Sequence, residues 1–173
     1  MREMEIYGVS FDLVGKQPIV LLKTSNGNKF LPIWIGHSEA AAILVKLQNA
    51  AVTRPMTHDL VTDMLGQLDA EVVAVTVTEL RENTFYARIT LQQNGSEIEI
   101  DSRPSDAIAL AVRAGARIFA VDEVIEESGI EFEGEGSEHD ELAGVTPLAE
   151  LDPDEFRRFL DTVSPDEFAK DEE

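Results

Sequence analysis

The sequence predicts an α+β fold, built mainly of antiparallel sheets with helices. Two observations support this prediction. Asn-Gly pairs at residues 26–27 and 94–95 each lie between apolar, strand-like segments, and this is the strongest short-range signal of a β-hairpin. About ten residues after each pair, a helix-start signal opens an alanine-rich apolar segment.

The strands of the first half come first in the chain. Residues 4–13 alternate loosely and indicate a strand, and residues 17–23 and 28–35 flank the first Asn-Gly turn. Pro32 lies inside the last of these segments, and proline has no N–H to donate to a neighbouring strand. We therefore expect this strand to be at an edge or to be irregular.

Two helices are expected after these strands. Residues 40–47 predict a mainly buried helix. Thr57 is expected to cap the second helix. The apolar residues of this second helix fall at helical spacing, and they are Leu60, Val61, Met64, Leu65 and Leu68.

The second half repeats this order of elements. Residues 72–80 and 84–92 predict a strand pair, and residues 96–101 follow the second Asn-Gly turn as another strand. Residues 107–112 predict a buried helix. One more strand (residues 118–121) and a short helix (residues 124–128) are expected after it.

The repeated order suggests an internal duplication of a β-β-β-α unit. Such a duplication places Glu39 and Asp106 at equivalent helix starts. Chance similarity between two capped, alanine-rich helices explains the same pattern, and superposing the two halves distinguishes these explanations.

Charge divides the chain into parts. Residues 1–121 carry 14 Asp and Glu against 11 Lys and Arg, whereas residues 122–173 carry 20 against 3. We therefore predict a nearly neutral domain at residues 1–128, an acidic flexible linker at 129–147, and an acidic tail at 148–173. We expect the tail to contain a short amphipathic helix with an apolar stripe, formed by Phe156, Phe159, Leu160 and Val163.

Composition excludes several classes of protein. The chain has no Cys, which rules out disulfides, zinc–thiolate sites and thiol catalysis. We see neither a signal peptide nor an apolar run long enough for a membrane span, and we expect a cytoplasmic protein. The chain also lacks the basic stripe of a dedicated nucleic-acid binder, so nucleic acid is expected as a substrate rather than a tight ligand.

Residues 100–107 form the junction around which the chain is organised. A strand turns there into a helix, with Ser105 as the expected N-cap and Pro104 fixing the backbone. The first N–H groups of a helix suit a phosphate, and Arg103 could add a bidentate clamp. Asp106 at such a place is also ordinary helix capping.

Several motifs together resemble the bifunctional nuclease domain family over roughly residues 5–128. The motifs are residues 31–36 with Glu39, residues 54–60, residues 85–87 and residues 101–107. The resemblance implies an α+β domain that is usually oligomeric, a dimer in the first instance, and a nuclease acting on DNA and RNA. By position it directs attention to nine residues: Glu39, Arg54, Thr57, His58, Asp59, Asp101, Arg103, Ser105 and Asp106.

Phosphodiester hydrolysis needs an activated water and stabilised phosphoryl charge, and these residues offer candidates for each role. We expect a catalytic set of acids and one histidine: His58, Asp59, Asp101, Asp106 and Glu39. Phosphate binding is expected from Arg54, Arg103, Ser105 and Thr57. Asp101, Asp106 and Glu39 suit Mg²⁺ or Mn²⁺ as ligands.

Two other interpretations use the same residues. Arg54 and Arg103 each precede a proline and could form purely structural ion pairs with nearby acids. The chain could also be a non-catalytic oligomeric module that binds an anionic ligand or a protein. In that case the tail at residues 148–173 would be the docking element for a protein partner.

Overall fold

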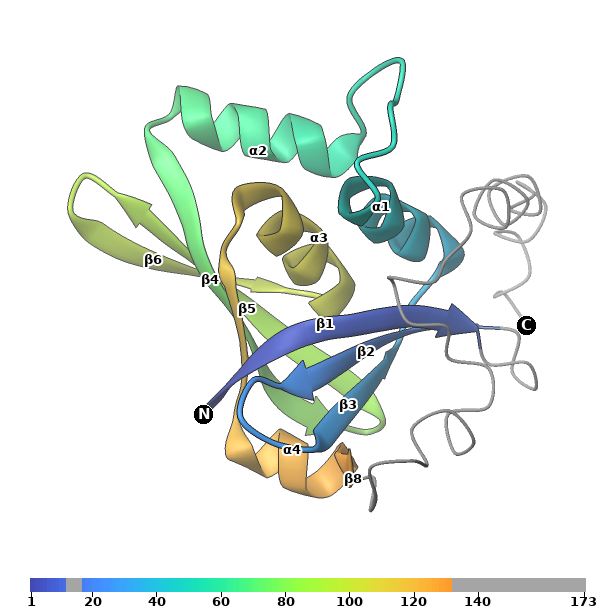
Figure 1. The fold of residues 1–173 in the computed structure, drawn as a ribbon. Coiled ribbons are helices and arrows are strands. Elements are labelled where there is room, and N and C mark those ends of the chain that lie inside the picture. Colours follow the sequence, from blue (N-terminus) through green and yellow to red (C-terminus); the bar gives the residue numbers. More distant parts are fainter. Residues whose placement is uncertain (12–16, 132–173) are drawn as a thin grey trace.

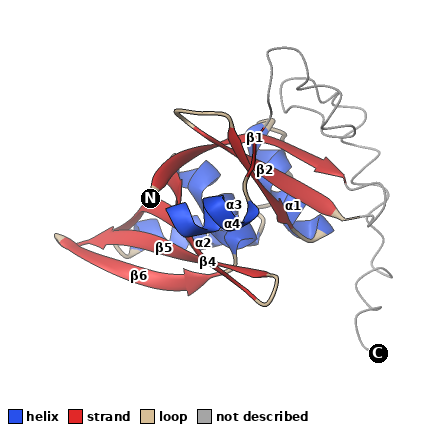
Figure 2. Cartoon of the chain, turned by 90° about the horizontal axis from the view of Figure 1, so that it is seen from below, coloured by secondary structure: helices blue, strands red, loops and turns tan. Residues whose placement is uncertain are grey.

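The structure, a computed structural model, describes residues 1–11 and 17–131. Within them, eight strands form one sheet with four helices, which confirms the α+β class (Figure 1 and Figure 2). The strands are β1 (Arg2–Phe11), β2 (Pro18–Thr24), β3 (Lys29–Trp34), β4 (Ala70–Arg81), β5 (Thr84–Gln93), β6 (Ser96–Ser102), β7 (Arg117–Ala120) and β8 (Ile130–Glu131). The helices are α1 (His37–Leu47), α2 (Thr57–Gln67), α3 (Pro104–Ala114) and α4 (Asp122–Ser128).

The sheet has the strand order β6-β5-β4-β7-β1-β2-β3-β8. Two three-stranded antiparallel groups, β1–β3 and β4–β6, are joined through β7, and β8 pairs with the outer side of β3. β7 pairs antiparallel with β1 and parallel with β4. Both predicted Asn-Gly turns connect adjacent antiparallel strands, and in the second turn Asn94 and Gly95 have φ of 49° and 79°, as a tight hairpin requires.

The order of elements repeats as expected from the sequence. Each three-stranded group is followed by a helix, α1 after β3 and α3 after β6. Glu39 and Asp106 both lie at the third residue of their helix. An ancestral duplication stays a prediction, because matching connectivity does not by itself exclude chance similarity.

The helices α1, α2 and α3 lie together over one side of the sheet, and α4 lies at the other end of the molecule (Figure 1). Ala107, Ala109 and Ala111 are at most 1% exposed. These small side chains let α3 lie close to β4 and β5, and α1 and α2 pack against α3 in turn.

α2 is only partly buried. Val61 and Leu65 pack against the core, as expected for one side of an amphipathic helix. The other three predicted apolar positions, Leu60, Met64 and Leu68, are 54%, 56% and 61% exposed. The helical spacing was predicted correctly, but the apolar residues extend onto a part of the helix surface that does not contact the core.

Two predicted helix caps are wrong by one or two residues. The N-cap of α2 is Met56 rather than Thr57, because the Met56 N–H donates to Oδ2 of Asp59 at 2.8 Å. The N-cap of α3 is Arg103 rather than Ser105, because Pro104 occupies the first helical position and holds Arg103 extended.

The outer edge near β3 agrees with the expectation for Pro32. β8 pairs only with Lys29 and Phe30, so Pro32 lies where no further strand needs an N–H donor. β8 itself falls at residues 130–131, where the sequence predicted the linker to have begun. The tail and the remaining predicted linker residues lie outside the described residues.

The described helices are all short. The longest span 11 residues, and none in residues 1–11 and 17–131 has the length and apolar character needed to cross a membrane.

Candidate active site at the start of α3

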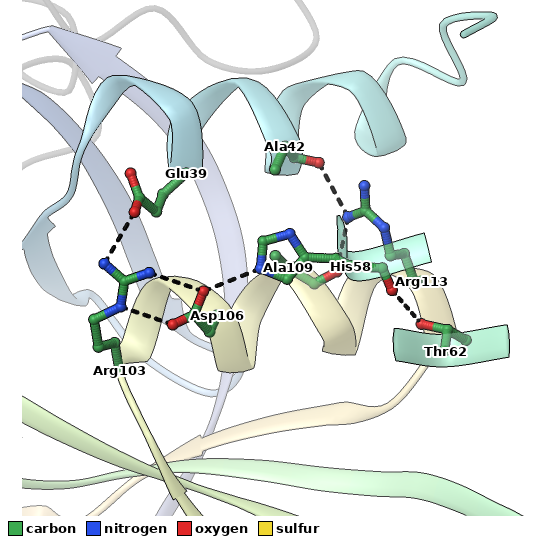
Figure 3. Close-up of polar contacts among 8 residues, drawn as sticks. All are labelled: Glu39, Ala42, His58, Thr62, Arg103, Asp106, Ala109 and Arg113. Atoms are coloured by element: carbon green, nitrogen blue, oxygen red, sulfur yellow. Dashed lines mark hydrogen bonds and ion pairs between the residues drawn. The ribbon is translucent and has the colours of Figure 1, made fainter. Parts of the chain in front are cut away.

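Arg103 is held at the junction between β6 and α3. Its backbone is extended, with φ −70° and ψ 146°, and the helix begins at the next residue. The side chain is 65% exposed and binds Asp106 in a bidentate manner, with Nε 2.7 Å from Oδ2 and Nη2 3.1 Å from Oδ1 (Figure 3). The guanidinium group is therefore held in a fixed orientation at the N-terminal end of α3.

Glu39 reaches the same guanidinium from α1. Its Oε1 lies 2.9 Å from Nη1 of Arg103, and the Glu39 side chain is 19% exposed. The Glu39 carboxylate folds back against Gly36, where an added Cβ would collide with it. Gly36 is thus the residue that leaves room for Glu39 to turn toward Arg103.

His58 completes the group from the first turn of α2. Its Nε2 atom lies 3.0 Å from Oδ1 of Asp106, and the side chain is 15% exposed. A carboxylate can only accept hydrogen bonds, so Nε2 carries the proton and Nδ1 is the acceptor in the neutral ring. Within α2, the Thr62 hydroxyl donates to the carbonyl of His58 at 2.9 Å.

Asp106 is the centre of this network. Burial raises the pKa of its carboxyl group, but the hydrogen bonds from Arg103 and His58 outweigh burial and hold the pKa below its usual value of 3.8. The pKa of Arg103 is raised, chiefly by its hydrogen bond to Asp106. Asp106 is therefore ionised at neutral pH and acts as the fixed acceptor for both partners.

Asp59 is next to His58 in sequence, but it binds different residues. Its Oδ1 accepts from Nε of Arg113 at 2.7 Å, and its Oδ2 accepts the Met56 N–H. Burial raises the Asp59 pKa, but these two hydrogen bonds and the charge of Arg113 lower it overall. These contacts tie the start of α2 to α3, and they give Asp59 a positioning role for His58.

Arg113 is a residue that the sequence analysis missed. Its side chain is only 3% exposed, and Nη1 donates to the carbonyls of Ala42 and Ala109 at 3.0 and 2.9 Å. Together with its contact to Asp59, these bonds join α1, α2 and α3, and Figure 3 shows the bonds to Ala42 and Ala109. The only signal in the sequence was a single arginine inside an otherwise apolar helical segment.

Asp101 is not brought into this group. It is exposed on β6, where Arg88 is its partner on β5. Side chains alternate along a strand, so Asp101 lies on the opposite face from Ile100, and Ile100 shares its face with core residue Ile89. Asp101 therefore lies on the side of the sheet away from the helices.

The predicted metal ligands are consequently not assembled. Glu39 and Asp106 are both bound to Arg103, and Asp101 lies on another face. Within residues 1–11 and 17–131, no three acidic or histidine side chains gather closely enough to hold a metal ion. The donor set described here does not fit Mg²⁺ or Mn²⁺.

The predicted phosphate-binding residues are divided between three cavities. Thr57 lines a cavity of about 270 Å³ together with His58, Arg103 and Asp106. Ser105 lies at the second position of α3, 5% exposed, at a neighbouring cavity of about 550 Å³ that Arg103 also lines. Arg54 is exposed in a third cavity of about 380 Å³ beyond Asp59 and does not join the group.

The arrangement combines three chemical functions within one cleft. His58 has a ring nitrogen available to accept a proton, Asp106 orients the ring, and Arg103 presents a guanidinium to an anion. A histidine oriented by a carboxylate beside an anion-binding arginine is suited to acid–base chemistry on a phosphate or carboxylate ester.

Comparisons with known proteins give the family. The sequence profile described as the bifunctional nuclease domain matches residues 20–133. An uncharacterized protein from Mycobacterium tuberculosis is 38% identical over 168 residues, which is 97% of this chain and 98% of that protein.

Plant relatives match a shorter part. Bifunctional nuclease 1 from Oryza sativa subsp. indica is 32% identical over 98 residues, 54% of this chain and 30% of that protein. Bifunctional nuclease 1 from Arabidopsis thaliana is 32% identical over 100 residues, 56% of this chain and 31% of that protein. The similarity to the plant proteins thus covers under a third of their length. The chain belongs to the bifunctional nuclease domain family.

Proposed function

We propose that this protein is a nuclease that hydrolyses phosphodiester bonds of DNA, RNA or both. The observation that carries the proposal is the hydrogen bond between His58 and Asp106 beside the exposed guanidinium of Arg103. The plant relatives are named bifunctional nucleases, which supports the same chemistry, although they match over only part of their length.

In the proposed reaction, Arg103 binds the phosphate through N–H groups that Glu39 and Asp106 do not use. Nδ1 of His58 accepts a proton from a water molecule, and the water oxygen forms a bond to phosphorus. The bond from phosphorus to the leaving sugar oxygen breaks, and that oxygen takes a proton from solvent. Asp106 stabilises the imidazolium that forms, as carboxylates do in other hydrolytic sites.

No step in this proposal passes through Mg²⁺ or Mn²⁺, because Glu39 and Asp106 are engaged by Arg103. Whether cleavage requires either ion is determined by experiment. The assay is cleavage of labelled single- and double-stranded DNA and RNA by purified protein with Mg²⁺, Mn²⁺ or EDTA. We expect folded His58→Ala and Arg103→Ala proteins to lose cleavage.

Asp101→Asn is the matched control in this assay. Asp101 was predicted to be catalytic, but it lies on another face of the sheet, so this variant is expected to keep its activity. Equal activity of wild type and His58→Ala would instead identify a contaminating nuclease and remove the proposal.

A second candidate function, an oligomeric binding module, is supported by the exposed apolar residues of α2. Leu60, Met64 and Leu68 lie on successive turns and are more than half exposed. We propose a second copy of the chain as the occupant of this face. A Leu60→Glu/Met64→Glu double variant that elutes at the same molar mass as wild type in light scattering would argue against it.

The tail is tested separately. If a protein from which residues 148–173 are deleted binds the same protein partners as the full chain, the result would argue against docking through the tail.

A further inference from the structure

The cavity of about 550 Å³ beside Arg103 is not used by the proposed reaction. Gln17 and three segments line it: residues 33–37 at the end of β3, residues 83–85 at the turn between β4 and β5, and residues 103–105 at the start of α3. Its volume lies within the range of small-ligand sites in proteins, about 300–1,000 Å³. The cavity can therefore hold one flat organic group.

Trp34 provides an aromatic wall for this cavity. It is 50% exposed, while its neighbours Ile33 and Ile35 are buried at 1% and 8%. β3 thus turns its largest side chain out of the core and toward the cavity, where it can stack on a planar ring. Phe85 lines the cavity as a second aromatic side chain.

Polar groups in the same cavity suit the edge of a nucleobase. Ser105 is 5% exposed, and no hydrogen bond to its hydroxyl is found among the described residues. Asn83 also lines the cavity, and an asparagine amide offers both a donor and an acceptor. A base on Trp34 would thus meet partners that can pair with its polar edge.

Arg103 connects this cavity to the candidate active site. It lines both the cavity with Trp34 and the smaller cavity with His58 and Asp106. A phosphate bound to Arg103 therefore has its reacting centre on the His58 side and an adjoining nucleoside on the Trp34 side. Bases in a duplex are stacked on each other and cannot enter such a cavity, whereas unpaired bases can.

We propose that the Trp34 cavity binds one unpaired nucleobase next to the phosphate held by Arg103, so that the protein acts on single-stranded nucleic acid. This inference rests on the proposed nuclease function for its cleavage part. Its binding part rests on the cavity alone, so the two can be tested separately.

Trp34 is the only tryptophan of the chain, so intrinsic tryptophan fluorescence reports on this site alone. The experiment titrates wild-type protein with phosphorothioate-linked oligothymidylate or oligoadenylate of about ten nucleotides, and with a blunt duplex of the same length. Stacking of an unpaired base predicts quenching by the single strands and little change with the duplex. Equal quenching by both, or none, overturns the inference.

Variants then test the cleavage part. Trp34→Ala is expected to raise KM for single-stranded substrate about tenfold or more, since one stacked base contributes on that scale. Trp34→Phe should restore most of the affinity, and Ile98→Ala, which removes an exposed apolar side chain on β6, should leave KM unchanged. An unchanged KM in folded Trp34→Ala, with cleavage intact, overturns the inference but leaves the nuclease function standing. Quenching by single strands without any cleavage keeps the base site and removes the nuclease function.

Discussion

Nε2 of His58 and Oδ1 of Asp106 lie 3.0 Å apart, although 48 residues separate them in the chain. The contact joins the first turn of α2 to the first turn of α3. It places a titratable ring beside Arg103 at the surface, and the following predictions depend on this geometry.

Replacing His58 by Gln should lower kcat by about 100-fold or more, because glutamine keeps hydrogen bonding but cannot accept a proton from water. Asp106→Asn should lower kcat as well, since the amide no longer stabilises an imidazolium. Steady-state kinetics on a labelled oligonucleotide measures both effects. Glu99→Gln, which breaks only the exposed ion pair with Arg88, is the control and should behave as wild type.

The free energy of unfolding should decrease at acidic pH as Asp106 becomes protonated. Its folded-state pKa lies below 3.8, so the ionised form is favoured more in the folded than in the unfolded chain. This contribution is present when the pH is above the unfolded-state pKa and is lost as the pH falls through the folded-state pKa. Urea unfolding between pH 3 and 7 should show a weaker pH dependence in Asp106→Asn. A slope identical to that of wild type would mean that Asp106 is not stabilised in its ionised form.

Arg113→Met should lower the free energy of unfolding by about 2–4 kcal/mol, because Asp59 and the carbonyls of Ala42 and Ala109 lose a buried donor. Arg88→Met removes an exposed ion pair and should cost under about 1 kcal/mol. Denaturant unfolding compares the two. Similar losses would contradict the joining role of Arg113.

Gly36→Ala should reduce activity with little loss of stability. The new Cβ meets the end of the flexible Glu39 side chain, which can move away but then leaves Arg103. Gly66→Ala is the matched control: nothing in α2 obstructs a Cβ there, and alanine should raise stability by about 0.5–1 kcal/mol. Activity of Gly36→Ala equal to that of Gly66→Ala would show that Glu39 does not position Arg103.

Local features of this fold could be predicted from the sequence because they depend on neighbouring residues. The Asn94-Gly95 turn and the alternation of the strands are of this kind. The short strand β8 could not be predicted, since two residues have no pattern of their own and pair only because α4 returns the chain to β3.

The candidate site was predicted only in part, because some of its contacts join residues that are far apart in the chain. Motif positions identified Glu39, His58, Arg103 and Asp106, and the structure brings these four together. The role of Asp59 depends on Arg113, which is 54 residues away in the chain. Asp101 is close to Arg103 in sequence, but the alternation of β6 turns it to the other face of the sheet. The role of Asp59 is decided by a contact between helices, and a single sequence does not reveal such a contact.

The position of β7 has a consequence for synthesis of the chain. β7 lies between β4 and β1, yet it follows both of them in sequence. A growing polypeptide that has not reached Arg117 carries two separate three-stranded halves, each with an unpaired inner edge that can accept a foreign strand. A chain released from the ribosome before that residue is therefore prone to wrong pairing, and within the sheet the four residues Arg117–Ala120 bring the halves together.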